Sequence, residues 1–308
     1  MKRTFLTALL SLMMSVGALF AYDAQVGDLR YLLDNNSQTA TVTYYMSSMT
    51  QGMWNGIIST TLTTANIPET IDVKINDTET KTYTVVAIDA RAFENCKALE
   101  TVTIPNTVQS IGESAFRDCI KLESVQMGNG VTSIDNYAFY NCNSLPHLTI
   151  SNSVTSIGDY AFYNCTSLFS VNLPEALTSL GFYAFLHCSS LAYVTLPDSL
   201  KKIEDATFNG CTSLEYVYIP LSATEIGTWA FKDCPLKRVV WGARNCTAYD
   251  FGDQIESFEF CGPVEVIPNG LCKGKSFPDT YDYIYTRHRH RVRRHLGEYP
   301  EHGKSDRR

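Results

Sequence analysis

Phenylalanine recurs at every twenty-third position through the middle of the chain, and this period constrains the fold more than any other feature. Cysteine follows each of these phenylalanines three positions later. The seven pairs are Phe93/Cys96, Phe116/Cys119, Phe139/Cys142, Phe162/Cys165, Phe185/Cys188, Phe208/Cys211 and Phe231/Cys234. A unit of this length has too little apolar surface to fold alone, so consecutive units must stack and bury a shared core.

Further apolar columns keep the same period and fill the rest of the unit. Leucine lies six positions after the phenylalanine, at Leu99, Leu122, Leu145, Leu168, Leu191 and Leu214. Isoleucine or leucine lies five positions before it, at Ile88, Ile111, Ile134, Ile157, Leu180, Ile203 and Ile226. After each leucine come two apolar positions at a spacing of two, which is the pattern of one face of a β-strand. Each column is therefore predicted to form a ladder inside the stack.

Each unit is expected to contain two short strands joined by turns. A Pro-Asn or Pro-Asp pair reverses the chain after the first strand, and a second extended piece, such as residues 108–111, returns along the other side. The Ala-Phe-x-x-Cys segment is then expected to form a short helical turn, capped by Asp159 or Glu113 in their units. With strands about 4.8 Å apart, seven units give a stack roughly 30 Å long.

The full repeat, Leu-x-x-Val-x-Leu/Ile-Pro-x-x-Val-x-x-Ile-Gly-x-x-Ala-Phe-x-x-Cys, resembles the BspA-like class of leucine-rich repeats, which occurs in bacterial surface and secreted proteins. The resemblance covers roughly residues 81–260, or about seven repeats. It implies a repeat solenoid of right-handed coils and a role in adhesion to host matrix proteins or to other cells. It implies no enzymatic activity, and no catalytic residues follow from it.

Residues 1–21 have the layout of a secretory signal peptide. Met1-Lys2-Arg3 is a short positive segment, residues 4–20 are largely apolar, and Ala21 precedes a polar stretch. A membrane anchor is the alternative, but no later segment approaches the roughly 18 consecutive apolar residues of a membrane span. The sequence therefore predicts export, a secreted or cell-surface location, and no stable membrane span.

The repeats are flanked by segments that are expected to cover their ends, because an uncapped stack exposes strand edges. Residues 22–80 are predicted to form an N-terminal β cap, with a strand at residues 41–45 and a hairpin at residues 72–86. At the other end, residues 261–275 read as a degenerate repeat remnant.

Residues 276–308 form a basic tail without apolar periodicity, and we expect it to be disordered. The net charge of −7 argues against a nucleic-acid-binding protein, but it combines +5 for residues 287–308 with −12 for the rest. The alternating His and Arg residues of the tail suit a polyanion or a metal ion. The alternative, which we favour, is a solvated terminus produced by a shifted reading frame.

Other chemistry finds little support in the sequence. The seven cysteines of the column read as small buried hydrophobes, while one disulfide among Cys246, Cys261 and Cys272 stays open. No Cys-x-x-Cys pair suggests zinc, and residues 270–276 depart from the spacing of a phosphate-binding loop. His187 has no partner for catalysis. No cofactor or metal is expected, and a hydrolase would need a polar constellation that the sequence does not show.

The outward positions of the first strand in each unit are the predicted binding face. The pairs that flank the central apolar residue are Thr101/Thr103, Ser124/Gln126, His147/Thr149, Ser170/Asn172, Tyr193/Thr195, Tyr216/Tyr218 and, with a slip in register, Arg238/Val240. The face begins small and polar and ends aromatic, and tyrosine and arginine commonly anchor interfaces. We therefore predict that His147, Tyr193, Tyr216, Tyr218 and Arg238 contact a partner. The alternative is that these aromatic rings shield a solenoid end.

A second aromatic column, Tyr137, Tyr160, Tyr183 and Trp229, is expected on the turn side of the units. Mutual stacking that rigidifies the solenoid is the favoured interpretation of this column. The leading functional hypothesis is adhesion to a host matrix or cell-surface protein, or to another bacterial surface protein, through the sheet face. The alternative is a passive spacer of the cell envelope with no dedicated ligand.

Overall fold

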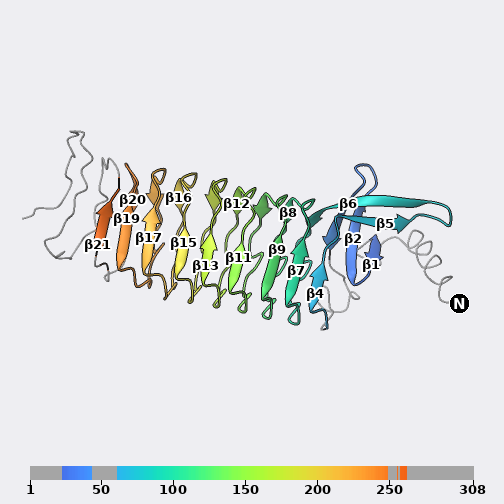
Figure 1. The fold of residues 1–308 in the computed structure, drawn as a ribbon, viewed down its shortest axis with the longest axis horizontal. Coiled ribbons are helices and arrows are strands. Elements are labelled where there is room, and N and C mark those ends of the chain that lie inside the picture. The colour runs from blue at the N-terminus through green and yellow to red at the C-terminus, as the bar shows by residue number, and fades with distance from the viewer. Residues whose placement is uncertain (1–22, 44–60, 249–254, 256, 262–308) are drawn as a thin grey trace, which may run out of the picture.

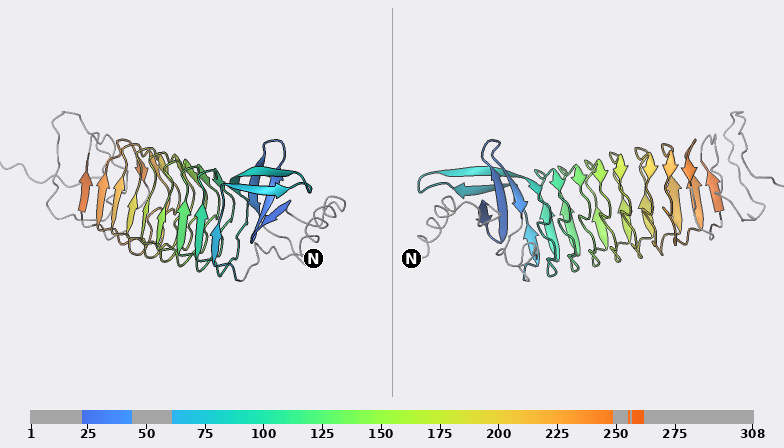
Figure 2. Two further views of the ribbon diagram at one scale, coloured as in Figure 1. Left: turned by 45° about the vertical axis from the view of Figure 1, so that its right-hand side comes forward. Right: turned by 180° about the vertical axis from the view of Figure 1, so that it is seen from behind.

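The protein is a solenoid of repeated coils stacked along one axis (Figure 1). This computed structural model describes residues 23–43, 61–248, 255 and 257–261. Each coil contributes one longer and one shorter strand, and the two kinds of strand form separate rows along the stack (Figure 2). The predicted leucine-rich repeat solenoid is therefore confirmed.

The longer strands form the row that carries the predicted binding face. They are β4 (Thr64–Asn66), β7 (Thr101–Ile104), β9 (Ser124–Met127), β11 (His147–Thr149), β13 (Ser170–Asn172), β15 (Tyr193–Thr195), β17 (Tyr216–Ile219), β19 (Arg238–Trp241) and β21 (Ser257–Phe260). They pair in parallel as β4-β7-β9, β11-β13-β15 and β17-β19-β21. The row is interrupted between β9 and β11, at Pro146. In the preceding coil the equivalent residue, Glu123, donates its N–H to the Glu100 carbonyl, and proline has no N–H to do so.

The register of this row follows the repeat and then slips once. Tyr193 lies beside Ser170, a full repeat before it, but Tyr216 lies beside Arg238, one position short of a full repeat after it. The segment Cys234-Pro235-Leu236 lacks one residue relative to the earlier units, as the sequence indicates. The slip brings Arg238 to the outward position next to Tyr216, as predicted.

The shorter strands line the opposite side of the coils. They are β8 (Ser110–Ile111), β10 (Ser133–Ile134), β12 (Ser156–Ile157), β14 (Ser179–Leu180), β16 (Lys202–Ile203), β18 (Glu225–Ile226) and β20 (Thr247–Ala248). They pair in parallel as β8-β10-β12-β14 and β16-β18-β20.

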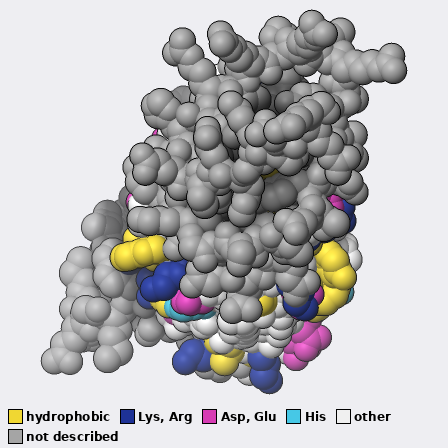
Figure 3. Space-filling view, turned by 90° about the vertical axis from the view of Figure 1, so that its left-hand side faces the viewer, with side chains coloured by type: hydrophobic (Ala, Val, Ile, Leu, Met, Phe, Trp, Pro, Cys, Tyr) yellow, Lys and Arg dark blue, Asp and Glu magenta, His cyan; other side chains and the backbone are white. Residues whose placement is uncertain are grey.

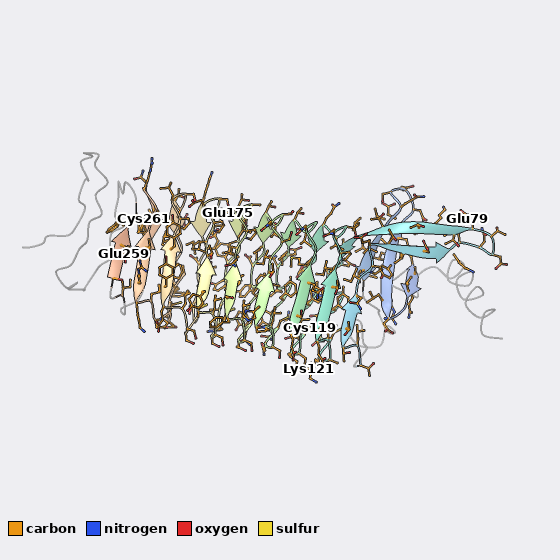
Figure 4. The ribbon with its side chains drawn as sticks, viewed as in Figure 1. Glu79, Cys119, Lys121, Glu175, Glu259 and Cys261 are labelled. Atoms are coloured by element: carbon orange, nitrogen blue, oxygen red, sulfur yellow. The ribbon has the colours of Figure 1, made fainter. Side chains whose placement is uncertain are left out.

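The N-terminal strands continue this second row. They are β1 (Ala24–Val26), β2 (Leu29–Asp34), β3 (Thr39–Thr43), β5 (Thr70–Lys74) and β6 (Thr80–Ile88). The end of β6 pairs with β8, so these strands join the solenoid directly. β5 and β6 form the hairpin that the sequence predicts, with Glu79 near its tip (Figure 4). The fully buried Tyr83 fixes this hairpin, because its hydroxyl donates to Asn35 Oδ1 at 2.6 Å.

The phenylalanine column forms the axis of the core. All seven rings have no exposed surface, and each stacks on the next with centroids 5.0–5.5 Å apart and planes within 10°. The leucine and isoleucine columns are buried beside them. Equivalent side chains therefore lie on top of one another, as the period predicts.

The predicted short helical turns are wrong, because the described residues contain no helix. Backbone N–H groups in the Ala-Phe-x-x-Cys segment of each coil alternate between two kinds of acceptor. Ala115 and Cys119 donate to carbonyls three positions back, as in a β-turn, whereas Phe116 and Asp118 donate to carbonyls of the next coil. Ser114 and Asp118 also have positive φ, 56° and 58°, which a right-handed helix excludes.

The expected helix cap bonds between coils instead. Asp159 Oδ1 accepts the backbone N–H of Phe182, in the following coil, at 2.8 Å. Asn136 Oδ1 accepts the N–H of Asp159 in the same way. These side chains thus satisfy the turns of the following coil rather than the first turn of a helix.

The cysteine column is buried and contains thiols rather than disulfides. Each Sγ from Cys119 to Cys234 donates to the carbonyl of the phenylalanine in the preceding coil, at 3.0–3.3 Å. Burial raises the pKa of Cys142 well above its ordinary value. The thiol is therefore a small core side chain that also ties one coil to the next.

Three predictions fall outside the described residues. They are the signal peptide at residues 1–21, all but the first residue of the remnant at 261–275, and the basic tail at 276–308. No helix in the described part of the chain is long and apolar enough to cross a lipid bilayer.

Candidate functional site

The outward face of the longer strands carries exposed aromatic side chains toward its C-terminal half. Along each strand the central residue is buried and its neighbours face outward, as with Val194 between Tyr193 and Thr195. Tyr193 is 61% exposed and Tyr216 is 37% exposed. Both therefore lie on the surface, at the outward positions to which the sequence assigns them.

His147, Phe169 and Tyr193 form a row across three consecutive coils. The ring centroids of His147 and Phe169 lie 6.3 Å apart, and those of Phe169 and Tyr193 lie 5.5 Å apart. Both contacts are edge-to-face, at 83° and 68°. Phe169 is 46% exposed and was missed by the sequence reasoning, which considered only strand residues. It is the only aromatic residue in its repeat column, and this departure from the column could have identified it from the sequence.

Tyr216 and Arg238 form a second contact at the next coils. The Arg238 guanidinium lies 5.4 Å from the Tyr216 ring centroid. Arg238 also donates two hydrogen bonds of 2.8 Å to the Glu259 carboxylate on β21. These bonds lower the pKa of Glu259 and raise the pKa of Arg238. Arg238 is thus engaged within the protein, by a partner that the sequence analysis did not identify.

Tyr218 differs from the other predicted site residues because it is partly buried. Burial is the main cause that raises the pKa of its hydroxyl, which lies against the Cys261 thiol. Cys261 and Glu259 lie at the last described strand, at the far end of the stack from Glu79 (Figure 4). Tyr218 therefore lies near the C-terminal end of the sheet face, and it is not part of the exposed row formed by His147, Phe169 and Tyr193.

The tyrosines on the turn side stack on one another, as the favoured interpretation of this column states. Tyr160 lies 5.0 Å from Tyr137 and 4.7 Å from Tyr183, with planes within 14°. The parallel pair Tyr140 and Tyr163 stacks at 4.5 Å. Stacked rings cover each other's faces, so this column contributes rigidity.

Neither a cluster of metal ligands nor a disulfide occurs among the described residues. No group of three or more His, Cys, Asp or Glu side chains there is placed to hold a metal ion. Cys246 is buried, Cys261 is exposed, and neither forms a disulfide in the described part of the chain, while Cys272 lies outside it.

Stacked coils of nearly constant length with a leucine, phenylalanine and cysteine ladder define a leucine-rich repeat protein. The family model for the BspA type leucine-rich repeat region matches in six copies, over residues 86–211 and 132–262. These matches span more than half of the chain, which therefore belongs to the BspA-type leucine-rich repeat family. No curated protein matches the chain.

Solved structures of leucine-rich repeat proteins have a similar fold. A leucine-rich repeat protein of Bacteroides ovatus is 24% identical, with a TM-score of 0.61 over 78% of this chain and 67% of that chain. The leucine-rich repeat protein TpLRR of T. pallidum is 26% identical, with a TM-score of 0.52 over 71% of this chain and 85% of that chain. The repeat family is not an enzyme class.

Proposed function

We propose that this protein is a secreted or cell-surface adhesion protein that binds a macromolecule through the outward face of its longer strands. The partner is a host matrix or cell-surface protein, or another bacterial surface protein. Membership of the BspA-type family supports this proposal, and so does the signal-peptide layout of residues 1–21.

The exposure of Tyr193 is the observation that carries the proposal. Tyr193 is 61% exposed at a position where earlier coils have Thr101, Ser124, His147 and Ser170. Those coils keep the same buried columns, so stacking of the core does not require an aromatic ring there. Exposed tyrosines next to an arginine are typical of residues that anchor protein interfaces.

Capture from extracts of extracellular matrix and of bacterial surfaces tests the proposal. The wild-type protein should retain a defined partner, and the double variant Tyr193→Ser/Tyr216→Ser should lose it. Trp229→Ser is the matched control, since Trp229 is 53% exposed on the turn side. Thermal unfolding of all variants should remain close to wild type, because every substituted ring is exposed.

Two results would contradict this assignment. Equal retention by the double variant would remove the sheet face as the binding surface. Failure of the wild type to retain any partner would favour the alternative, a passive spacer of the cell envelope.

A further inference from the structure

Three successive coils present an outward surface without a lysine, arginine, aspartate or glutamate side chain. We call this surface the uncharged panel and define it as residues 143–149, 166–172 and 189–195, which include β11, β13 and β15. The chain contains 19% charged residues, which would place about four in a set of this size. The equivalent segments of the two preceding coils each carry a lysine and a glutamate: Lys97 and Glu100, then Lys121 and Glu123.

The charges at the C-terminal border of the panel neutralise each other. Glu215 is the only charged residue in the equivalent segment of the next coil, and it accepts a 2.7 Å bond from Lys237. Arg238 pairs with Glu259, as described above. In the view from this end, some basic side chains lie beside acidic ones and others stand apart (Figure 3). A ligand on the panel therefore meets no unbalanced charge at this border.

The aromatic rings of the panel leave ring faces available. Phe169 and Tyr193 meet edge-to-face at 68°, so the edge of one ring covers only part of the other. They are 46% and 61% exposed, respectively. The stacked tyrosines of the turn side, by contrast, cover one another's faces. Open ring faces thus distinguish the panel from the other aromatic column.

Neutral hydrogen-bonding groups surround these rings. Thr149, Asn172 and Thr195 occupy outward strand positions and are exposed, and Ser170 is partly exposed beside them. Thr195 Oγ1 donates to Asn172 Oδ1 at 3.2 Å, which leaves the remaining donors and acceptors of both groups directed to solvent. The coils repeat about every 4.8 Å along the axis, a spacing comparable to the rise of one sugar unit in an extended glycan.

We propose that the uncharged panel binds a neutral glycan chain laid along the solenoid axis. The C–H faces of its pyranose rings pack on Phe169 and Tyr193, and its hydroxyl groups exchange hydrogen bonds with the serine, threonine and asparagine side chains. The panel offers no lysine or arginine for a sulfate or carboxylate group, which disfavours acidic glycans. This inference rests on the proposed function, because surface and matrix proteins carry glycans that such a face would contact.

Affinity electrophoresis of the full chain tests the inference. The gels contain one soluble polysaccharide each: mannan, β-glucan and galactan as neutral probes, and heparin and hyaluronan as acidic probes. At least one neutral probe should retard the wild-type protein. Phe169→Ala/Tyr193→Ala should weaken this interaction at least about tenfold, which corresponds to about 1.4 kcal/mol, and Trp229→Ala should leave it unchanged.

The possible failures separate the two proposals. No retardation by any neutral probe, or retardation that survives Phe169→Ala/Tyr193→Ala, would overturn the glycan inference. Capture of a protein without glycans that requires Tyr193 would also overturn it, yet would leave adhesion through the sheet face standing. Loss of both polysaccharide and protein binding to the wild type would overturn both.

Discussion

Two phenylalanines of the same coil provide a direct test of the packing argument. Phe162 belongs to the buried ladder, and Phe169 lies on the outward face seven positions later. The two variants Phe162→Ala and Phe169→Ala remove the same atoms from the same repeat. Their effects on the free energy of unfolding should differ because only one ring is part of the core.

The expected cost of Phe162→Ala is about 3–5 kcal/mol, the usual range for a buried phenylalanine. Its ring has no exposed surface and stacks on Phe139 at 5.4 Å and on Phe185 at 5.1 Å. The cavity cannot close easily, because the Phe162 N–H is bonded to the Ala184 carbonyl of the next coil at 2.8 Å. Phe169→Ala should cost only about 1 kcal/mol, since that ring is 46% exposed and makes edge contacts.

Urea unfolding followed by circular dichroism measures both values by linear extrapolation. The slope of the free energy of unfolding against urea concentration should be the same for the wild type and both variants, because the whole stack should unfold in one step. A variant that unfolds in parts would show a smaller slope. A cost below about 1.5 kcal/mol for Phe162→Ala, or a cost equal to that of Phe169→Ala, would refute the ladder as the source of stability.

Three further predictions address the turns, the stacked tyrosines and the thiols. Asn141→Val should cost about 1–2 kcal/mol more than Asn141→Gly in thermal unfolding, because Asn141 has φ of 58°; equal costs would show that this conformation is unimportant. Tyr160→Ala should lower stability by about 1–3 kcal/mol, since the ring stacks on Tyr137 and Tyr183, and should leave sheet-face binding unchanged; loss of binding would count against the division into two columns. Burial raises the pKa of the Cys96 thiol from 9.0 to about 12. The contribution of this thiol to the free energy of unfolding should therefore be complete below pH 9. It should fall by up to about 1.4 kcal/mol per pH unit between pH 9 and 12, because the unfolded chain loses the thiol proton first. Urea unfolding at pH 8 and 10.5 checks this, and Cys96→Ala should reduce the difference between the two values.

The columns of the core were predictable because the period reports which side chains share an environment. Every residue one or more whole repeats away from Phe139 had to meet the same neighbours, so one inward assignment placed all seven rings. The β-turns that replace the expected helical turns were not predictable in this way. The spacing of Ala-Phe-x-x-Cys suits a helix and a series of β-turns equally. The choice depends on donors such as the Phe116 N–H, whose acceptor lies in the next coil.

The outward face was predictable only in part. Alternation along a strand placed Tyr193 and Tyr216 on the surface, but it gave no information about Phe169, which precedes the strand β13. The partner of Arg238 was also hidden, because Glu259 lies beyond the point where the repeat pattern decays. Single side-chain contacts across coils depend on the local register, which the period no longer fixes there.

The repeat separates the demands of folding from those of recognition within each coil. The inward columns and the backbone bonds between coils supply the stability, and they are the same whether the outward residue is Thr101 or Tyr193. An outward substitution therefore changes what the face can bind at little cost to the stack. Because neighbouring coils hold equivalent positions in register, changes in successive repeats add up along the axis. The uncharged panel extends over three coils, so a ligand that matches it must be elongated along the solenoid axis over that distance.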